Sequence, residues 1–246
     1  MLPGGARPGP VPELESGPGS VMDSTVRDTF DRIASEYDEL KLRIIPGYRR
    51  IQQMALRYST GATRVLELGC GTGEWAALFL ERNPDTQYQA IEFSAKMREL
   101  ATARLSVHGD RFHLIDQDLN APLPAGPFDL VVSFFTIHHV DDKGRLFREV
   151  FDRLSAGRSL VVADVTVAGD FALGSSFLDG WIDFMREAGL EEERIPQVLD
   201  DHRRNDLAVP VAQLLTSLRE AGFETAEVVW SWEKFALLYA RKRPPL

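Results

Sequence analysis

Short apolar runs and helical patterns alternate along most of the chain. Runs suited to strands lie near residues 64–68, 87–92, 111–115, 128–133 and 159–164. Segments of helical composition follow three of these runs, near 74–82, 94–106 and 142–154. Strands that alternate with helices at this spacing form right-handed βαβ units. The pattern therefore predicts an α/β fold, with a parallel sheet covered by helices on both faces.

The two ends of this α/β region carry further elements. From Asp23 onward, apolar residues recur at spacings of three and four, which predicts an N-terminal helix. A second helical stretch runs from about Tyr48 to Tyr58, after a Pro-Gly break. Near the other end, a helix at about 210–221 precedes two extended runs, Thr225–Trp230 and Lys234–Ala240. A short turn joins these runs, so a terminal hairpin is expected.

The segment Arg64–Glu74 has the pattern of a strand, a glycine-rich turn and the start of a helix. Gly69, Gly71 and Gly73 lack the Cβ atoms that would keep a ligand away from the backbone. The free N–H groups of the following helix point into the same crevice. The dinucleotide fingerprint G-x-G-x-x-G would require glycine where Glu74 stands. The turn therefore favours a nucleoside-like cofactor without a pyrophosphate.

Five segments together resemble the class I S-adenosylmethionine (SAM) dependent methyltransferases. Glu67–Gly73 resembles motif I of that family. The other matches are Gln87–Met97 to the second strand, Ile115–Pro124 to the adenine loop, Phe128–Val140 to the fourth strand and Arg153–Asp164 to the turn into the fifth. The resemblance implies SAM as the cofactor. It also implies a Rossmann-like sheet of seven mostly parallel strands, with an antiparallel terminal hairpin and N-terminal lid helices.

The resemblance also implies which residues bind the cofactor. Glu92 would hold the ribose hydroxyls and Asp118 the adenine amino group. Tyr37 belongs to a lid-helix pattern and would touch the methionine part, although packing on the apolar helix face explains it equally well. The other predicted cofactor-binding residues lie in the glycine turn and at strand ends: Glu67, Gly69, Cys70, Gly71, Gly73, Phe93, Met97, Leu119, Ser133 and Phe134. In a parallel sheet these strand ends converge on one crevice.

His138 and His139 follow the predicted fourth strand and are the candidate catalytic residues. An acceptor hydroxyl or ammonium would need a base, and imidazole titrates near neutral pH. The pair stands in an apolar run, Phe134–Val140, where packing or positioning explains it without base catalysis. Along the sequence, no histidine, cysteine and carboxylate grouping has the spacing of metal ligands, so no metal is predicted.

A longer segment, residues 165–209, separates the fifth strand from the terminal helix and hairpin. It contains an aromatic stretch, Phe177–Met185, and a charged stretch, Asp200–Arg204. The resemblance implies that this insertion caps the acceptor pocket of a single methyltransferase domain, residues 23–246. The aromatic residues would line the pocket or belong to the core. Arg203 and Arg204 would clamp an acidic substrate or remain solvated.

Composition narrows the class of protein. A chain of 246 residues with 44% hydrophobic residues supports an ordinary folded core, and no apolar run approaches the length of a membrane span. The net charge of −9 argues against a nucleic-acid partner. The single cysteine, Cys70, excludes an internal disulfide and fits a reducing, cytoplasmic compartment.

Residues 1–22 are rich in glycine and proline, which predicts a disordered tail without the apolar core of a signal peptide. The sequence leaves a homodimer open.

Three functions are compatible with these motifs. The preferred one is transfer of a methyl group from SAM to a small-molecule acceptor, by in-line displacement in a desolvated pocket. The second is a carboxy-SAM synthase of tRNA wobble-uridine modification, which Ile45–Tyr48, Trp181–Phe184 and Ala221–Phe235 resemble. The glycine turn of that family usually departs from the G-x-G-x-G found in this chain. The third is a non-catalytic SAM-binding regulatory protein.

Overall fold

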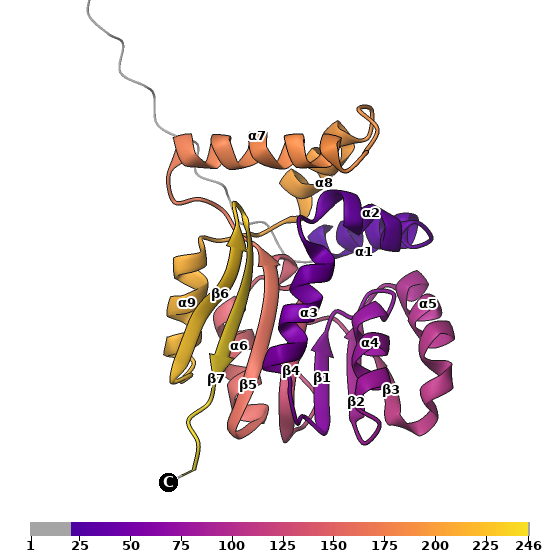
Figure 1. The fold of residues 1–246 in the computed structure, drawn as a ribbon, viewed down its shortest axis with the longest axis vertical. Coiled ribbons are helices and arrows are strands. Elements are labelled where there is room, and N and C mark those ends of the chain that lie inside the picture. Colours follow the sequence, from indigo (N-terminus) through magenta and orange to yellow (C-terminus); the bar gives the residue numbers. More distant parts are fainter. Residues whose placement is uncertain (1–20, 246) are drawn as a thin grey trace, which may run out of the picture.

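A twisted sheet of seven strands forms the centre of the molecule (Figure 1). The computed structural model describes residues 21–245, with side chains from residue 26 onward, so most of the predicted tail, residues 1–22, lies outside the described residues. The strands are β1 (Arg64–Leu68), β2 (Gln87–Glu92), β3 (Phe112–Asp116), β4 (Phe128–Phe134), β5 (Leu154–Val165), β6 (Thr225–Trp232) and β7 (Phe235–Arg241). Their order in the sheet is β3-β2-β1-β4-β5-β7-β6.

The strand directions confirm the predicted sheet. β1 to β5 are parallel, whereas β7 runs antiparallel to β5 and to β6. The chain order reverses between β1 and β4, where Leu68 pairs with Ser133. Such a switch point leaves a crevice outside the carboxyl ends of the two strands. The glycine turn follows β1 directly and therefore lies at this crevice.

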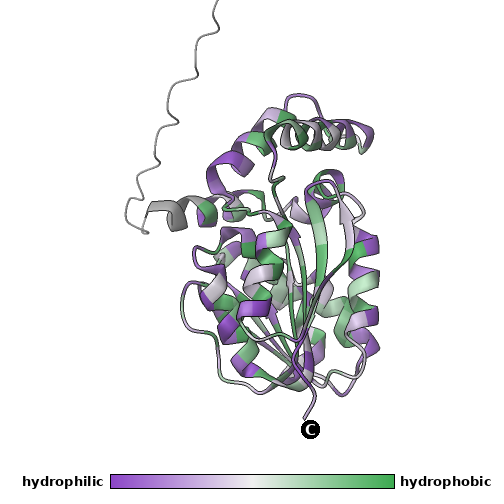
Figure 2. Ribbon diagram, turned by 90° about the vertical axis from the view of Figure 1, so that its left-hand side faces the viewer, coloured by the Kyte–Doolittle hydropathy of each residue, from purple (hydrophilic) through white to green (hydrophobic). Residues whose placement is uncertain are grey.

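Helices cover both faces of the sheet. They are α1 (Val21–Ile33), α2 (Tyr37–Ile44), α3 (Tyr48–Tyr58), α4 (Glu74–Arg82), α5 (Ala95–Leu105), α6 (Lys143–Arg153), α7 (Phe171–Glu187), α8 (Ile195–Asn205) and α9 (Val211–Glu220). Two short 3₁₀ helices complete the set, η1 (Ser106–Arg111) and η2 (Ile137–His139). The apolar sides of α3, α4 and α5 pack into one core, and those of α6 and α9 pack into a second core on the other face. Figure 2 shows the resulting mixture of hydrophobic and hydrophilic positions along these helices.

Two element boundaries differ from the prediction. The helical pattern that begins at Asp23 continues in the sequence to Leu40, but a turn at residues 34–36 divides it into α1 and α2. This turn brings the rings of Phe30 and Tyr37 edge to face, with centroids 6.0 Å apart. β5 begins at Leu154, before the predicted start at 159, because Leu154 already pairs with Phe128 ahead of a shift in register.

The insertion, residues 165–209, forms α7 and α8 and packs on the N-terminal helices above the sheet (Figure 1). The indole Nε1 of Trp181 on α7 donates a hydrogen bond of 2.7 Å to the carbonyl of Ile44 at the end of α2. The insertion and the N-terminal helices thus meet over one side of the crevice. Within residues 21–245, none of the helices has both the length and the apolar character that a membrane span requires.

Candidate active site

A cavity of about 350 Å³ lies at the carboxyl ends of β1, β2 and β4, against α1 and α2. Its size falls in the usual range for small-molecule sites. Eleven of the thirteen predicted cofactor-binding residues line it: Tyr37, Glu67, Gly69, Cys70, Gly71, Glu92, Phe93, Met97, Asp118, Leu119 and Phe134. Sequence motifs spread over three strands therefore converge on a single space.

The glycine turn forms the floor of this cavity. Gly69 and Gly71 have φ angles of +73° and +54°, in the left-handed region that side chains disfavour. A Cβ atom on Gly69 would collide with the side chain of Thr136, and a Cβ on Gly71 would lie 3.6 Å from the Tyr37 ring. The turn therefore brings bare backbone up to the cavity, as close approach of a ligand requires.

Glu92 fastens the glycine turn to the end of β2. Its Oε2 accepts a 2.8 Å hydrogen bond from the N–H of Gly71, and its Oε1 accepts a 2.9 Å bond from the N–H of Ser94. Burial raises the pKa of Glu92, and the N–H donors of Ser94 and Gly71 reduce that shift. Each carboxylate oxygen keeps lone-pair capacity for a further donor, such as a ribose hydroxyl.

Replacing Glu92 with alanine is expected to weaken SAM binding by roughly 2 kcal/mol or more, about 30-fold, because hydrogen bonds to a charged group are lost. Calorimetric titration with SAM measures this change. Glu99→Ala removes an equal charge from the exposed face of α5 and serves as the control, with parental affinity expected. Parental affinity in Glu92→Ala itself would contradict the assignment.

Lys41 and Asp38 link α2 to the rest of the cavity wall. The ammonium of Lys41, only 2% exposed, lies 2.7 Å from Asp38 Oδ1 and 2.6 Å from Glu74 Oε2. Asp38 also accepts hydrogen bonds from Thr72 in the glycine turn, at 2.6 Å, and from Arg104 on α5, at 2.5 Å. Burial opposes ionisation of Asp38, but these donors prevail and lower its pKa to about 2. We call this set of residues the Asp38 network.

Two predicted cofactor-binding residues lie outside the cavity lining. Gly73 packs against α5, where a Cβ would come within 2.7 Å of Leu105 Cδ1. Ser133 is fully buried, and its hydroxyl donates to the carbonyl of Leu68 at 3.0 Å. Cys70 lies in the lining, but burial raises the pKa of its thiol well above the usual value. A thiolate is therefore disfavoured. The small size of the cysteine side chain explains its presence in the turn.

Several lining residues carry no distinguishing pattern in the sequence. They include Lys41, Tyr48, Trp75, Asn120, Phe135, Thr136 and Asn205. Most of the aromatic ones are typical core residues, and no local pattern distinguishes a ring that borders a cavity. Phe135 carries one signal that is visible only in the backbone: its φ of +56° is rare for a side chain of this kind and marks a constrained position.

A second cavity, of about 140 Å³, adjoins the first. Its walls are largely apolar and come from α1, α2, α7 and α8, with Trp181 and Phe235 among them. Its polar lining residues are His138, His139, His202 and Asp206, together with Thr29, Arg32, Arg194, Gln197, Asp201 and Asn205. The two cavities share a boundary made by Val26, Phe30, Tyr37, Phe135, His139 and Asn205.

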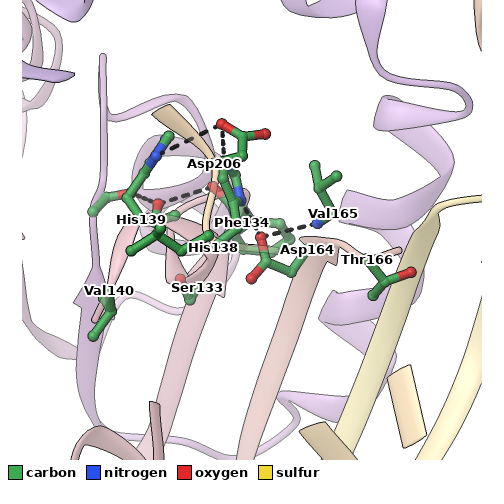
Figure 3. Close-up of polar contacts among 12 residues, drawn as sticks. Ser133, Phe134, His138, His139, Val140, Asp164, Val165, Thr166 and Asp206 are labelled. Carbon is green, nitrogen blue, oxygen red and sulfur yellow. Dashed lines mark hydrogen bonds and ion pairs between the residues drawn. The ribbon is translucent and has the colours of Figure 1, made fainter. Parts of the chain in front are cut away.

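The two candidate catalytic histidines have different environments (Figure 3). His138 Nδ1 lies 2.5 Å from Asp164 Oδ1; burial opposes protonation of His138, but the charges of Asp164 and Asp206 outweigh burial and raise its pKa. His139 Nδ1 donates to the carbonyl of Asn205 at 3.0 Å. Burial, with a smaller contribution from His138, lowers the pKa of His139 to about 3. His139 is thus neutral near pH 7.

The charged stretch of the insertion contributes differently from the expected clamp. Arg204 pairs with Asp200 at 2.8 Å on the surface, and Arg203 donates to the carbonyl of its own helix at Leu199. Neither arginine lines a cavity. Asp206, one residue beyond α8, is the residue of this region that joins the histidine pair.

Asp164 and Asp206 were missed as site residues. A signal for Asp164 exists in the sequence, since it is the one charged residue in the apolar run Leu160–Val165 at the end of a predicted strand. Asp206 has no such signal because His138 and His139, the residues it joins, are more than 60 positions away in the chain. The expectation that no metal-ligand grouping exists rested on local spacing, and the fold brings His138, His139 and Asp206 together.

Comparisons with known proteins agree on one family. The profile of a methyltransferase domain matches residues 65–157. A carboxy-S-adenosyl-L-methionine synthase of Klebsiella pneumoniae is 29% identical over 226 residues, which cover 87% of this chain and 91% of that protein. An uncharacterized methyltransferase of a Geobacillus species is 34% identical over 140 residues, covering 56% of this chain and 62% of the relative.

The fold is also found among solved methyltransferases. Human N-acetylserotonin methyltransferase, in a structure with SAM, superimposes with a TM-score of 0.61 at 14% identity. The match covers 92% of this chain and 60% of the human chain, so the present chain spans about three fifths of that protein. The profile match, the relatives and the converging motifs agree. The chain belongs to the class I SAM-dependent methyltransferases, enzymes whose cofactor is SAM.

Proposed function

We propose that this enzyme transfers the methyl group of SAM to a small-molecule acceptor held in the second cavity. The observation that carries the proposal is the shared boundary, where Phe135, His139 and Asn205 face both cavities. An acceptor in the second cavity would therefore lie directly beside a cofactor in the first. The protein's main task is then to align the nucleophile with the S–CH₃ bond and to exclude water.

The lining of the second cavity supports a compact acceptor of mainly apolar or aromatic character with one polar end. Trp181, Phe235 and Ile33 supply apolar surface. His138, His139 and Asp206 place polar groups together at one point of the wall, and Arg32, Arg194 and Asp201 are further charged lining residues. We propose that residues 165–209 act as the cap over this acceptor, since α7 and α8 contribute Trp181, His202 and several neighbours to the wall.

His139 is proposed to position the acceptor. His139→Ala should keep SAM affinity within about twofold and lower turnover by roughly 10²-fold, because a displaced nucleophile no longer lies in line with the methyl group. Transfer of labelled methyl groups measures turnover, and calorimetry measures SAM affinity. His113→Ala, which removes an exposed imidazole on β3, is the control. Parental turnover in His139→Ala would contradict this role.

Incubation with methyl-labelled SAM and a small-molecule extract of the source organism tests the function as a whole. A labelled low-molecular-weight product together with S-adenosylhomocysteine is the expected result. The near-full-length similarity to carboxy-SAM synthases favours a second candidate, which would give carboxy-SAM and no methylated acceptor. The presence of G-x-G-x-G in this chain weighs against it. Absence of turnover with any extract would favour a non-catalytic SAM-binding protein.

A further inference from the structure

His138, His139 and Asp206 meet at one point on the wall of the second cavity (Figure 3). Asp206 Oδ1 lies 3.6 Å from His138 Nε2 and 3.8 Å from His139 Nδ1. Both distances exceed the length of a hydrogen bond. The three side chains are 7–14% exposed and come from η2 and the residue after α8. The two imidazole nitrogens and the carboxylate oxygen therefore face one another without a direct hydrogen bond among them.

These separations suit a shared cation. First-row divalent cations bind imidazole nitrogen and carboxylate oxygen at about 2.1 Å, which separates neighbouring ligands by about 3.4 Å in a tetrahedral site. The two separations here exceed this value by only a few tenths of an ångström. Two histidines and one carboxylate also form a common ligand set for such cations, with further coordination positions left open.

The residues behind the three donors are arranged as they are in metal sites. Asp164 holds Nδ1 of His138 at 2.5 Å, which turns Nε2 toward Asp206. On the other side, His202 Nδ1 lies 2.5 Å from Asp206 Oδ2, and Lys234 lies against His202 Nε2. His202 thus donates to Oδ2 and leaves Oδ1 for the cluster. A carboxylate behind a ligating histidine fixes its tautomer and strengthens its binding to the metal.

The cationic side chains nearest to the cluster have other partners. Lys143 donates to the carbonyls of Val140 and Leu207, both at 2.8 Å. Lys234 is directed to His202 and the Trp181 ring. His139 Nδ1 donates to the Asn205 carbonyl, so a cation bound at this nitrogen requires the other neutral tautomer, with the ring proton on Nε2. Among the described residues, this is the one grouping of three or more such side chains that meets the geometry of a metal site.

We propose that His138, His139 and Asp206 bind a divalent first-row transition cation, of the class that includes Zn²⁺ and Fe²⁺, on the wall of the second cavity. Asp164 and His202 act as positioning residues for this site. Provided that the proposed function is right, the open coordination positions face the acceptor, and an acceptor oxygen bound there loses its proton more readily. Metal binding itself requires no acceptor.

The test uses the full chain after removal of metals with a chelator, titrated with Zn²⁺ by calorimetry without any acceptor. One Zn²⁺ per chain is expected. Asp206→Asn, which removes a ligand, should lower the affinity at least about 100-fold, and Asp164→Asn should lower it roughly 10- to 100-fold. His113→Ala and Asp152→Asn remove an exposed imidazole and an exposed carboxylate elsewhere, so they should leave the Zn²⁺ affinity unchanged.

SAM affinity is measured on each variant as a check that the variant is folded. Asp206 and Asp164 do not line the cofactor cavity, so a folded variant keeps its affinity for SAM. Zn²⁺ binding that is equally tight in a folded Asp206→Asn variant would overturn the proposal, as would no binding to the parent at about 100-fold molar excess. Either result is independent of whether methyl transfer occurs.

Discussion

Substitution of Gly71 by valine is expected to abolish SAM binding. The residue has a φ of +54°, which a β-branched side chain resists, and it lies on the floor of the cofactor cavity. The new methyl groups would also extend toward the Tyr37 ring, whose Cε1 is 3.6 Å from the position of a Cβ. Calorimetry with SAM measures the effect, and no heat of binding should remain.

Gly61→Val separates loss of the site from backbone strain. Gly61 also has a positive φ, +73°, but no atom outside its immediate chain neighbours lies within 4 Å of a Cβ placed there. This variant should lose stability, by roughly 1–3 kcal/mol, and still bind SAM. If Gly71→Val binds SAM like the parent, the cofactor lies elsewhere.

Glu67→Gln is expected to flatten the pH dependence of stability between about pH 4.5 and pH 8. Burial raises the pKa of Glu67 to about 8, a neighbouring charge on Glu92 adds to the shift, and the hydroxyl of Tyr88, 2.8 Å from Oε2, reduces it. The unfolded chain ionises near the ordinary value of about 4.5, so its proton is lost first. The contribution of Glu67 to the unfolding free energy is therefore full below pH 4.5. It is lost as the pH rises through 8.

The parent should lose on the order of 3–5 kcal/mol of unfolding free energy across this window from Glu67 alone, at about 1.4 kcal/mol per pH unit. Glutamine keeps an acceptor for Tyr88 and has no charge to develop, so its stability curve should be flatter by that amount. Denaturant unfolding at a series of pH values measures it. Glu81→Gln, an exposed change on α4, should follow the parent. A parental slope in Glu67→Gln would show that Glu67 is already ionised in the folded protein.

Local patterns were sufficient to predict the sheet, whereas the lining of the first cavity was predicted mainly from the resemblance of the motifs to a known family. β1 and β2 were placed to the residue because each is a short apolar run that ends at a polar or glycine position. Glu92 and Asp118 were named from the resemblance to SAM-dependent methyltransferases. Both line the first cavity, because parallel strands bring their carboxyl ends to one edge. The start of β5 was missed, since Ser155, Gly157 and Arg158 show no apolar alternation. Gly157 and Arg158 form backbone hydrogen bonds with Arg243 and Lys242, just beyond β7.

The polar side of the second cavity could not be derived in this way. Asp164, His138 and Asp206 come from β5, η2 and the residue after α8, and their proximity depends on how the insertion packs on the rest of the domain. Periodicity predicts that α7 and α8 are helices but not which residues they present to which neighbour. The same reason explains why Arg203 and Arg204, adjacent in sequence to the correct region, point elsewhere.

Phe30 and Tyr37 form a partition with a cavity on either side, and Asp38 fastens the same helical segment to Thr72 and Arg104. Displacement of α1 and α2 would dismantle both compartments together. If the second cavity holds the acceptor, as proposed, that site is complete only while α1 and α2 stay in place over the first cavity. We then expect an ordered cycle, in which SAM binds before the acceptor and S-adenosylhomocysteine leaves last.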